Sequence, residues 1–277
     1  MSKHLKTIFN FITRKKPTIP VLKLTGIIAS GGFSRGRINS ENLENNIKKA
    51  FSDSNAKAVA LIVNSPGGSP VQSSLIYKRI RYFADKREIP ILVFVEDVAA
   101  SGGYWLACAG DEIFADYSSI IGSIGVISAS FGFVDAMKKI GIERRVYTSV
   151  KSKGSLDPFK PENPNDVKIL KKIQTNIHEI FVNHVKSRRG AKLNIDNKEI
   201  FSGAFWSAED ALKLGLIDGI GELREILRSR FGKDIRIKVI ENKKGFLSNL
   251  TQTFSDAFLS LLVEKYENKS FWSKFGK

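Results

Sequence analysis

Short apolar runs rich in β-branched residues alternate along this chain with segments of helical periodicity. The apolar runs predict strands at residues 21–28, 58–63, 91–95, 113–115, 120–121, 125–128 and 144–148. The helical segments are predicted at residues 40–51, 70–86, 102–109, 134–140, 166–188 and 207–214. Alternation of this kind is typical of a layered α/β fold built from βα units.

The two ends of the chain differ from this regular middle. Residues 1–20 form a short basic amphipathic segment without an acidic residue, and residues from about 241 to 277 carry a second amphipathic pattern. We therefore divide the chain into an N-terminal segment 1–20, a domain 21–240 and a C-terminal amphipathic helical extension 241–277. No run reaches the roughly 18–20 apolar residues that span a bilayer, and the start lacks a signal-peptide pattern. We expect a cytoplasmic protein, with peripheral contact to the inner face of the cytoplasmic membrane left open.

Composition narrows the class of protein further. The 277 residues are 42% hydrophobic and 26% charged, which excludes disorder or a fibrous repeat as a description of the whole chain. Cys108 is the only cysteine, so no internal disulfide forms, and no Cys/His spacing suggests zinc. We expect no metal and no cofactor. The net charge of +16 favours anionic partners such as a lipid surface, although solvated lysines explain it equally well.

Glycine-rich turns close three of the predicted strands, at residues 64–68, 101–103 and 122–125. Glycine at such a turn lets backbone N–H groups approach a ligand closely. A helix that starts there adds unpaired donors, which can stabilise an oxyanion. Any one of these motifs, taken alone, is more simply an ordinary tight βα turn.

Ser101 is the best candidate nucleophile because it sits at such a turn among small residues. A serine hydroxyl needs a neighbouring base. His4 lies in the basic tail, and His178 and His184 lie six residues apart on a helix, which does not place them on one face. We interpret both helix histidines as core or surface residues.

A lysine is the other base that a serine can use. It works only when neutral, so the pKa of such a group must fall from about 10.4 towards about 7–8. Lys151, Lys153 and Lys160 are candidates in the loop that ends the regular region. Because most lysines are solvated surface charges, the residues alone do not choose among the three.

Three motifs in order resemble one known family. They are Asn64-Ser65-Pro66-Gly67-Gly68, Ala100-Ser101-Gly102-Gly103-Tyr104-Trp105-Leu106-Ala107 and Gly122-Ser123-Ile124-Gly125-Val126. A later stretch with Trp206-Ser207-Ala208 and Leu214-Gly215-Leu216-Ile217-Asp218 also fits. Together they cover roughly residues 20–220 and resemble the signal peptide peptidase A and SohB-like serine peptidases of family S49, in the short, single-repeat form.

The resemblance implies a ClpP/crotonase-like βα superhelical fold and a Ser–Lys dyad that cleaves peptide bonds. Ser101 matches the nucleophile, and Lys153, 52 residues later, matches the general base. Gly68 and Gly102 match the oxyanion-hole donors, and Ser123 matches a hydroxyl that orients the lysine. The implied substrates are signal-peptide remnants or other short or unfolded peptides near the membrane. The implied assembly is a homo-oligomeric ring.

Two other classes of function stay open on the sequence alone. An acyl-CoA enzyme of the crotonase class would share the fold and the oxyanion glycines without requiring Ser101. A non-catalytic basic adaptor for membranes or nucleic acid would explain the charge. We expect no nucleic-acid partner, because no basic–aromatic interleaving or recognised motif is found.

Overall fold

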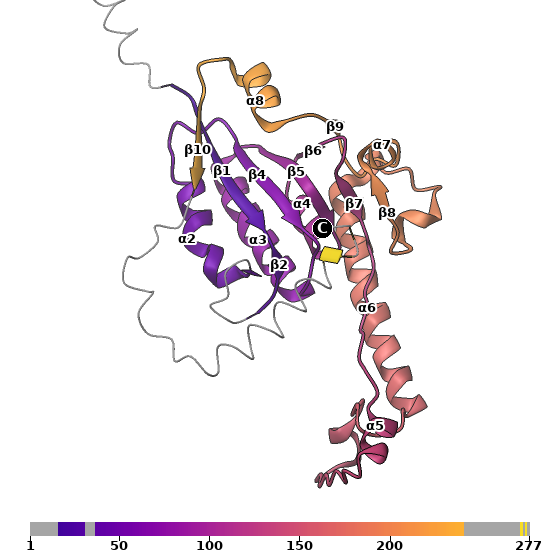
Figure 1. Ribbon diagram of the computed structural model, residues 1–277. Coiled ribbons are helices and arrows are strands. Elements are labelled where there is room, and N and C mark those ends of the chain that lie inside the picture. Colours follow the sequence, from indigo (N-terminus) through magenta and orange to yellow (C-terminus); the bar gives the residue numbers. More distant parts are fainter. Residues whose placement is uncertain (1–15, 31–36, 241–271, 274, 276–277) are drawn as a thin grey trace, which may run out of the picture.

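The computed structural model describes residues 16–30, 37–240, 272–273 and 275. Residues 1–15 of the predicted N-terminal segment 1–20, and all of the predicted extension 241–277 except residues 272, 273 and 275, lie outside these residues. Parallel strands form the centre of the molecule in the order β10-β1-β4-β5-β6-β9 (Figure 1). Their bounds are β10 Arg236–Ile240, β1 Thr18–Thr25, β4 Val59–Ser65, β5 Ile91–Ala100, β6 Glu112–Ala115 and β9 Gly219–Ile220.

Smaller strands extend the sheet where β5 ends. Strand β7 (Ile120–Gly122) pairs in parallel with the last residues of β5, and β8 (Phe205–Ser207) pairs antiparallel with β7. Strands β2 (Ile27–Ile28) and β3 (Arg37–Ile38) form a separate parallel pair beside the end of β1. An isolated bridge between Ile28 and Gly68 joins this pair to the turn after β4.

Helices α2 (Ser40–Ala50), α3 (Pro70–Arg87) and α4 (Gly102–Ala107) cover one face of the sheet, and their apolar sides form the main core with it. Helix α3 begins where Ser69 accepts a hydrogen bond from the Gln72 amide at 3.4 Å and Pro70 occupies the first turn. Helix α8 (Leu223–Phe231) packs through Leu227 on the opposite face. Helix α7 (Ala208–Lys213), with Ser207 as its N-cap, begins directly after β8.

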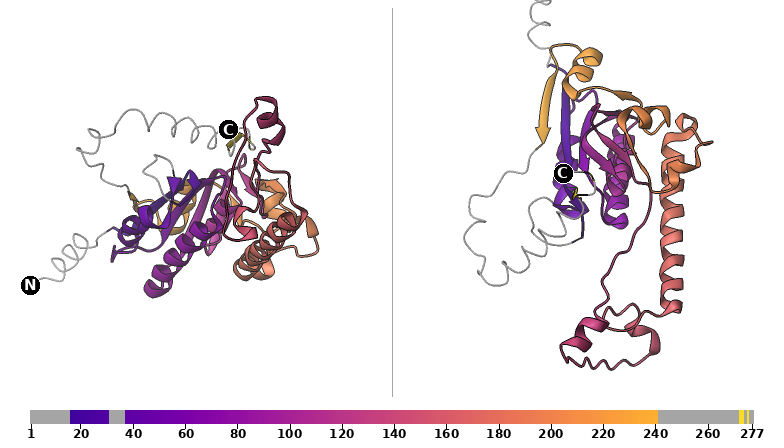
Figure 2. Two further views of the ribbon diagram at one scale, coloured as in Figure 1. Left: turned by 90° about the horizontal axis from the view of Figure 1, so that it is seen from below. Right: turned by 45° about the vertical axis from the view of Figure 1, so that its right-hand side comes forward.

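Helix α6 (Pro164–Arg189) is long and runs beyond the sheet (Figures 1 and 2). The chain between β7 and α6, which we call the arm (residues 126–163), passes to the far end of α6 and forms α5 (Val134–Lys139) and the 3-10 helix η1 (Lys151–Gly154) there. Among the described side chains from residue 125 through residue 180, none is buried. The arm and the first half of α6 therefore share no core with the rest of this chain.

The predicted elements of the regular region are confirmed to within a few residues, with exceptions on the arm. The strands predicted at 125–128 and 144–148 are wrong, since both segments have irregular backbone. The helix predicted at 166–188 is present as α6, but Ile173 and Ile180 on it are 50% and 58% exposed. Only its C-terminal half packs on the core, where Phe181 stacks on Trp105 with ring centroids 4.9 Å apart.

Candidate active site

Ser101 occupies the single residue between the end of β5 and the start of α4. Its backbone has φ 52° and ψ −122°, a conformation that non-glycine residues rarely adopt. The Ser101 amide donates to the Gly122 carbonyl at 2.8 Å, which holds this turn against β7. The Ser101 hydroxyl makes no capping hydrogen bond to α4, so the junction leaves it available for chemistry.

Glycines pack against this serine so closely that no side chain would fit between them. A Cβ built on Gly67 would lie 2.8 Å from Cβ of Ser101 and 2.8 Å from the Gly102 nitrogen. A Cβ built on Gly102 would lie 3.3 Å from the Gly68 nitrogen. The amides of Gly68 and Gly102, the two glycines that the family resemblance matches to an oxyanion hole, thus lie close together beside Ser101.

The hydrogen bonds around Gly68 leave its own amide unused. Ile28 donates to the Gly67 carbonyl at 2.8 Å, and Ser69 donates to the Ile28 carbonyl at 2.7 Å. Gly102 is the first residue of α4, where an amide has no partner within the helix. Within the described residues neither amide donates a hydrogen bond, so both can serve an oxyanion.

Ser65 is a positioning residue that the sequence analysis did not single out. Its side chain is fully buried, its hydroxyl donates to the Gly26 carbonyl at 2.7 Å, and it accepts from the Gly67 amide at 3.2 Å. The hydroxyl thereby fixes the glycine turn to the end of β1. Small buried serines give no periodic signal in a sequence, which is why its role emerges only from the fold.

Two cavities meet at Ser101. The first, of about 530 Å³, lies along α6, is lined by Ser101, Ser123, Lys171 and His178 among others, and is called here the α6-side cavity. The second, of about 340 Å³, includes Ile28, Arg37 and Gly68 and is called the β2-side cavity. Residues 125–127 line both, so an extended chain laid along them would pass the Ser101 hydroxyl.

The structure brings Ser123 into the same cavity as Ser101. Ser123 has φ 50°, and its amide donates to the Ala204 carbonyl at 2.7 Å. The turn at the end of β7 is therefore anchored to the segment before β8. Phe275, near the C-terminus, lines this cavity too and meets Phe205 edge-on at 5.6 Å.

Lys153 does not lie beside Ser101 within one copy of the chain. Its 3-10 helix belongs to the arm, at the far end of α6 from α4 (Figure 2), and Lys153 lines neither cavity. Lys160 is on the same arm, with its ammonium near Gly154, and the side chain of Lys151 is outside the described part. Within one copy of the chain, the structure places neither Lys153 nor Lys160 beside Ser101.

The two helix histidines have different surroundings. His184 is packed between Trp105 and Tyr77 and has its Nε2 atom 3.2 Å from the Trp105 carbonyl. Burial lowers the pKa of His184 to about 4, so it is a neutral core residue. His178 instead lines the α6-side cavity, with its Nε2 atom 3.2 Å from the Ile124 carbonyl. Its contribution to the site was not predicted.

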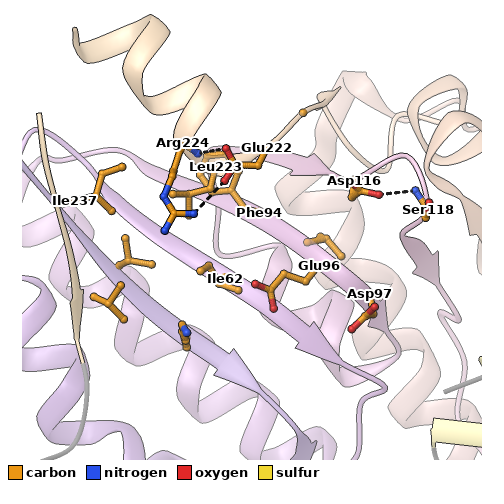
Figure 3. A pocket seen from close by; sticks show the side chains of 15 residues that line it. Ile62, Phe94, Glu96, Asp97, Asp116, Ser118, Glu222, Leu223, Arg224 and Ile237 are labelled. Atoms are coloured by element: carbon orange, nitrogen blue, oxygen red, sulfur yellow. Dashed lines mark hydrogen bonds and ion pairs between the residues drawn. The ribbon is translucent and has the colours of Figure 1, made fainter. Parts of the chain in front are cut away.

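A third cavity, of about 440 Å³, lies on the opposite face of the sheet, beside α8 (Figure 3). Apolar side chains such as Ile62, Phe94 and Ile237 form its floor, and Glu96 and Asp97 stand at its edge. Ser101 does not line it. In the part of the chain that the structure covers, no group of His, Cys, Asp and Glu is arranged to hold a metal ion. No helix in that part is long and apolar enough to cross a bilayer.

Comparison with solved structures shows the fold. The chain superimposes on the 1510-N membrane-bound stomatin-specific protease, bound to a substrate peptide, with a TM-score of 0.52 and 19% identity, covering 90% of this chain and 99% of that one. A second structure of that protease gives a TM-score of 0.51. The ClpP-like fold that the sequence predicted is confirmed.

Sequence comparison shows the family. A region of a Brucella abortus protein named Na(+)/H(+) antiporter NhaA is 53% identical over 230 residues, 83% of this chain and 31% of that protein. A signal peptide peptidase SppA of Enterococcus faecium is 32% identical over 75% of this chain and 61% of its own length. The chain thus spans about a third to three fifths of these relatives. The Peptidase family S49 profile matches residues 84–231, which is more than half of this chain. The chain therefore belongs to family S49, a family of serine proteases.

Proposed function

We propose that this chain is a serine endopeptidase that uses Ser101 as its nucleophile and Lys153 as its general base. The observation that carries the proposal is the geometry at the end of β5. There, a serine with an uncapped hydroxyl lies against two unpaired amides, at the junction of two cavities. This arrangement supplies a nucleophile, an oxyanion site and room for a chain on both sides.

The proposed reaction follows from these groups. Neutral Lys153 takes the proton of the Ser101 hydroxyl while Oγ attacks the scissile carbonyl carbon. The amides of Gly68 and Gly102 donate to the resulting oxyanion, and Ser123 orients the lysine. The lysine ammonium then gives its proton to the leaving amine as the C–N bond breaks. Water, deprotonated by the same lysine, hydrolyses the acyl-enzyme and restores the serine hydroxyl.

The location of Lys153 makes a second copy of the chain part of the proposal. The arm that carries it exposes large apolar side chains, such as Phe131 at 71%, Ile140 at 68% and Tyr147 at 90%. Exposed apolar side chains on a segment without a core are typical of a subunit interface. We therefore propose a homo-oligomeric ring in which the arm of one subunit delivers Lys153 to Ser101 of the next.

The proposed substrates are short or unfolded peptides near a membrane, including signal-peptide remnants. An open cleft between two cavities suits an extended peptide better than a folded protein. A membrane setting is supported by the name of the structurally similar protease, which is membrane-bound, and by the antiporter name of the Brucella protein. The basic N-terminal segment would favour peripheral contact with anionic lipid.

Hydrolysis of a fluorogenic peptide panel and of an unfolded protein tests this function. Wild type should cleave with activity that rises from neutral to mildly alkaline pH, because the base must be neutral. Ser101→Ala and Lys153→Ala should both lose at least about a hundredfold in kcat/KM with unchanged circular dichroism. Lys160→Ala, a change on the same arm, serves as the matched control and should retain activity.

Other outcomes would point elsewhere. Activity that survives in Lys153→Ala but disappears in Lys160→Ala would move the base to Lys160. Turnover of a CoA thioester by wild type and Ser101→Ala alike, without peptide cleavage, would overturn the peptidase proposal in favour of the crotonase class.

A further inference from the structure

The two cavities that meet at Ser101 share a charge pattern that differs from the rest of the molecule. Lys171 lines the α6-side cavity and Arg37 lines the β2-side cavity. Neither cavity has an Asp or Glu among its described lining residues. The cavity on the opposite sheet face, by contrast, is lined by more acidic than basic residues, namely Glu96, Asp97, Asp116 and Glu222 against Lys23 and Arg224 (Figure 3). The positive character of the cleft is therefore local, and not only a consequence of the net charge of +16.

One face of α6 supplies the polar wall of the α6-side cavity. Lys171, Gln174, Thr175 and His178 all line it, and their spacing of three, four and seven residues places them on one side of a helix. The contact of His178 with the Ile124 carbonyl at 3.2 Å connects this face to the turn that carries Ser123. The face is thereby held beside Ser101 although its half of α6 has no buried residue.

Lys171 is the one residue of this wall with a full positive charge. Its ammonium forms no ion pair with a described residue, and its side chain is exposed at the cavity. A lysine ammonium is a flexible, hydrated point charge that pairs readily with a carboxylate. None of the described residues that line the cleft offers a carboxylate to it, so a bound molecule can supply one.

We propose that Lys171 is a specificity residue that pairs with a carboxylate of the substrate, so that the cleft selects peptides with negative charge near the scissile bond. This inference rests on the proposed peptidase function and adds the substrate class. The carboxylate comes from an Asp or Glu side chain or from the free C-terminus of a short peptide.

Binding to the Ser101→Ala protein tests the inference without depending on catalysis. Fluorescently labelled peptides with amidated C-termini are made in pairs that carry either Glu or Gln, on one side or the other of the cleavage position. Each peptide is titrated with the Ser101→Ala protein, and binding is followed by fluorescence anisotropy. We expect the Glu peptide to bind about two- to fivefold more tightly at low salt, the range of an exposed ion pair. The preference should disappear at about 1 M salt, where the screening length is about 3 Å.

Charge reversal identifies the residue responsible. Lys171→Glu in the Ser101→Ala background should reverse the preference in favour of Gln. Lys172→Glu is the matched control, because it makes the same change in net charge on the next residue of α6 but does not line either cavity. It should leave the Glu preference unchanged.

A second pair of peptides separates the two carboxylate sources. A neutral peptide with a free C-terminal carboxylate is compared with its amide, and tighter binding of the free acid would identify the terminus as the ligand. Equal binding within both pairs, or equal effects of Lys171→Glu and Lys172→Glu, would overturn the inference. Wild type that cleaves no peptide would instead count against the proposed function, so the two failures are distinguishable.

Discussion

The Arg189 guanidinium, at the end of α6, donates to the Asp218 carboxylate just before β9 over 2.7 Å, and their side chains are only 2% and 12% exposed. Asp218 also accepts from the Ile113 amide at 2.8 Å, and Arg189 also donates to the Gly215 carbonyl at 2.9 Å. Burial by itself would raise the pKa of Asp218, but hydrogen bonds from Arg189 and Lys192 hold it below its usual value. The pair fastens the packed half of α6 to the sheet.

Removing the negative charge of this pair should destabilise the protein strongly. Asp218→Asn leaves the buried Arg189 charge without its counterion, and we expect a loss of about 3–5 kcal/mol in the free energy of unfolding. Urea denaturation at neutral pH, followed by circular dichroism, measures it. Lys192→Ala, which removes the half-exposed second partner of Asp218, should cost about 1 kcal/mol or less. Similar losses in both variants would show that burial does not distinguish the two contacts.

His184 predicts a pH dependence of stability. Burial lowers its pKa to about 4 in the folded protein, against an ordinary value of about 6.5. The unfolded state therefore binds a proton first as the pH falls. Stability is complete above about pH 6.5, decreases as the pH falls towards about 4, and stops depending on this group below that.

Replacing His184 by an aromatic residue that does not titrate should remove this dependence. His184→Phe keeps the stacking on Trp105 and the edge-on contact with Tyr77. We therefore expect the urea midpoint of this variant to change less between pH 7 and pH 5. The wild type should lose about 1–2 kcal/mol over the same interval. His178→Phe is the control variant. If it reduced the pH dependence of the urea midpoint as much as His184→Phe does, the dependence could not be assigned to His184.

The helices and strands of the regular region can be predicted from the sequence because their apolar residues are covered by other elements of the same chain. Strands β4 and β5 are apolar runs between covered faces, and the turns that follow them must be glycine-rich to bring Gly68 and Ser101 together. An apolar residue in a sequence is expected to be buried, but the sequence does not show whether the same chain or another subunit buries it. On the arm, Tyr147 lies in a segment predicted as a strand, but it is 90% exposed and no described strand pairs with it.

The site is predictable to a similar extent. Ser101 is a candidate because it lies at a glycine-rich strand end, whereas Gly68 and Gly102 are assigned from the family resemblance. The positions of His178 and Lys171 in the cleft depend on how α6 packs across the end of β7, which local periodicity does not encode. The residues themselves leave Lys151, Lys153 and Lys160 as equal candidates, and Lys153 is singled out only by the family resemblance.

Gly68 should not tolerate even a methyl group. Its φ is +138°, and a Cβ there would lie 2.0 Å from the Ile28 carbonyl oxygen, which is backbone that cannot turn away. We expect Gly68→Ala to lower the free energy of unfolding by about 2 kcal/mol or more and to abolish activity, by separating the amides of Gly68 and Gly102.

The control for this change is Gly132→Ala on the arm, where a Cβ meets nothing within 4 Å. Thermal unfolding and the peptide assay should both give wild-type values for it. A Gly68→Ala protein of normal stability and activity would show that the turn after β4 can shift away from Ile28, and would remove Gly68 from the oxyanion site.

The arm predicts that two inactive variants restore one another. If Lys153 of one subunit acts on Ser101 of the next, a site is active when its Ser101 comes from a Lys153→Ala subunit and its lysine from a Ser101→Ala subunit. Random assembly of equal amounts around a ring of head-to-tail contacts makes about one quarter of the sites competent. Mixing after mild dissociation and reassembly should recover activity near that level, whereas the Ser101→Ala/Lys153→Ala double variant mixed with either partner should recover none.

The same arrangement predicts that exposed apolar side chains of the arm hold the ring together. Phe131→Ser and Tyr147→Ser should therefore reduce the assembled fraction in size-exclusion chromatography together with activity. Co-assembly of the two inactive variants without any recovery would mean that the dyad forms within one chain, and the arm would then have to bend back along α6 to reach Ser101.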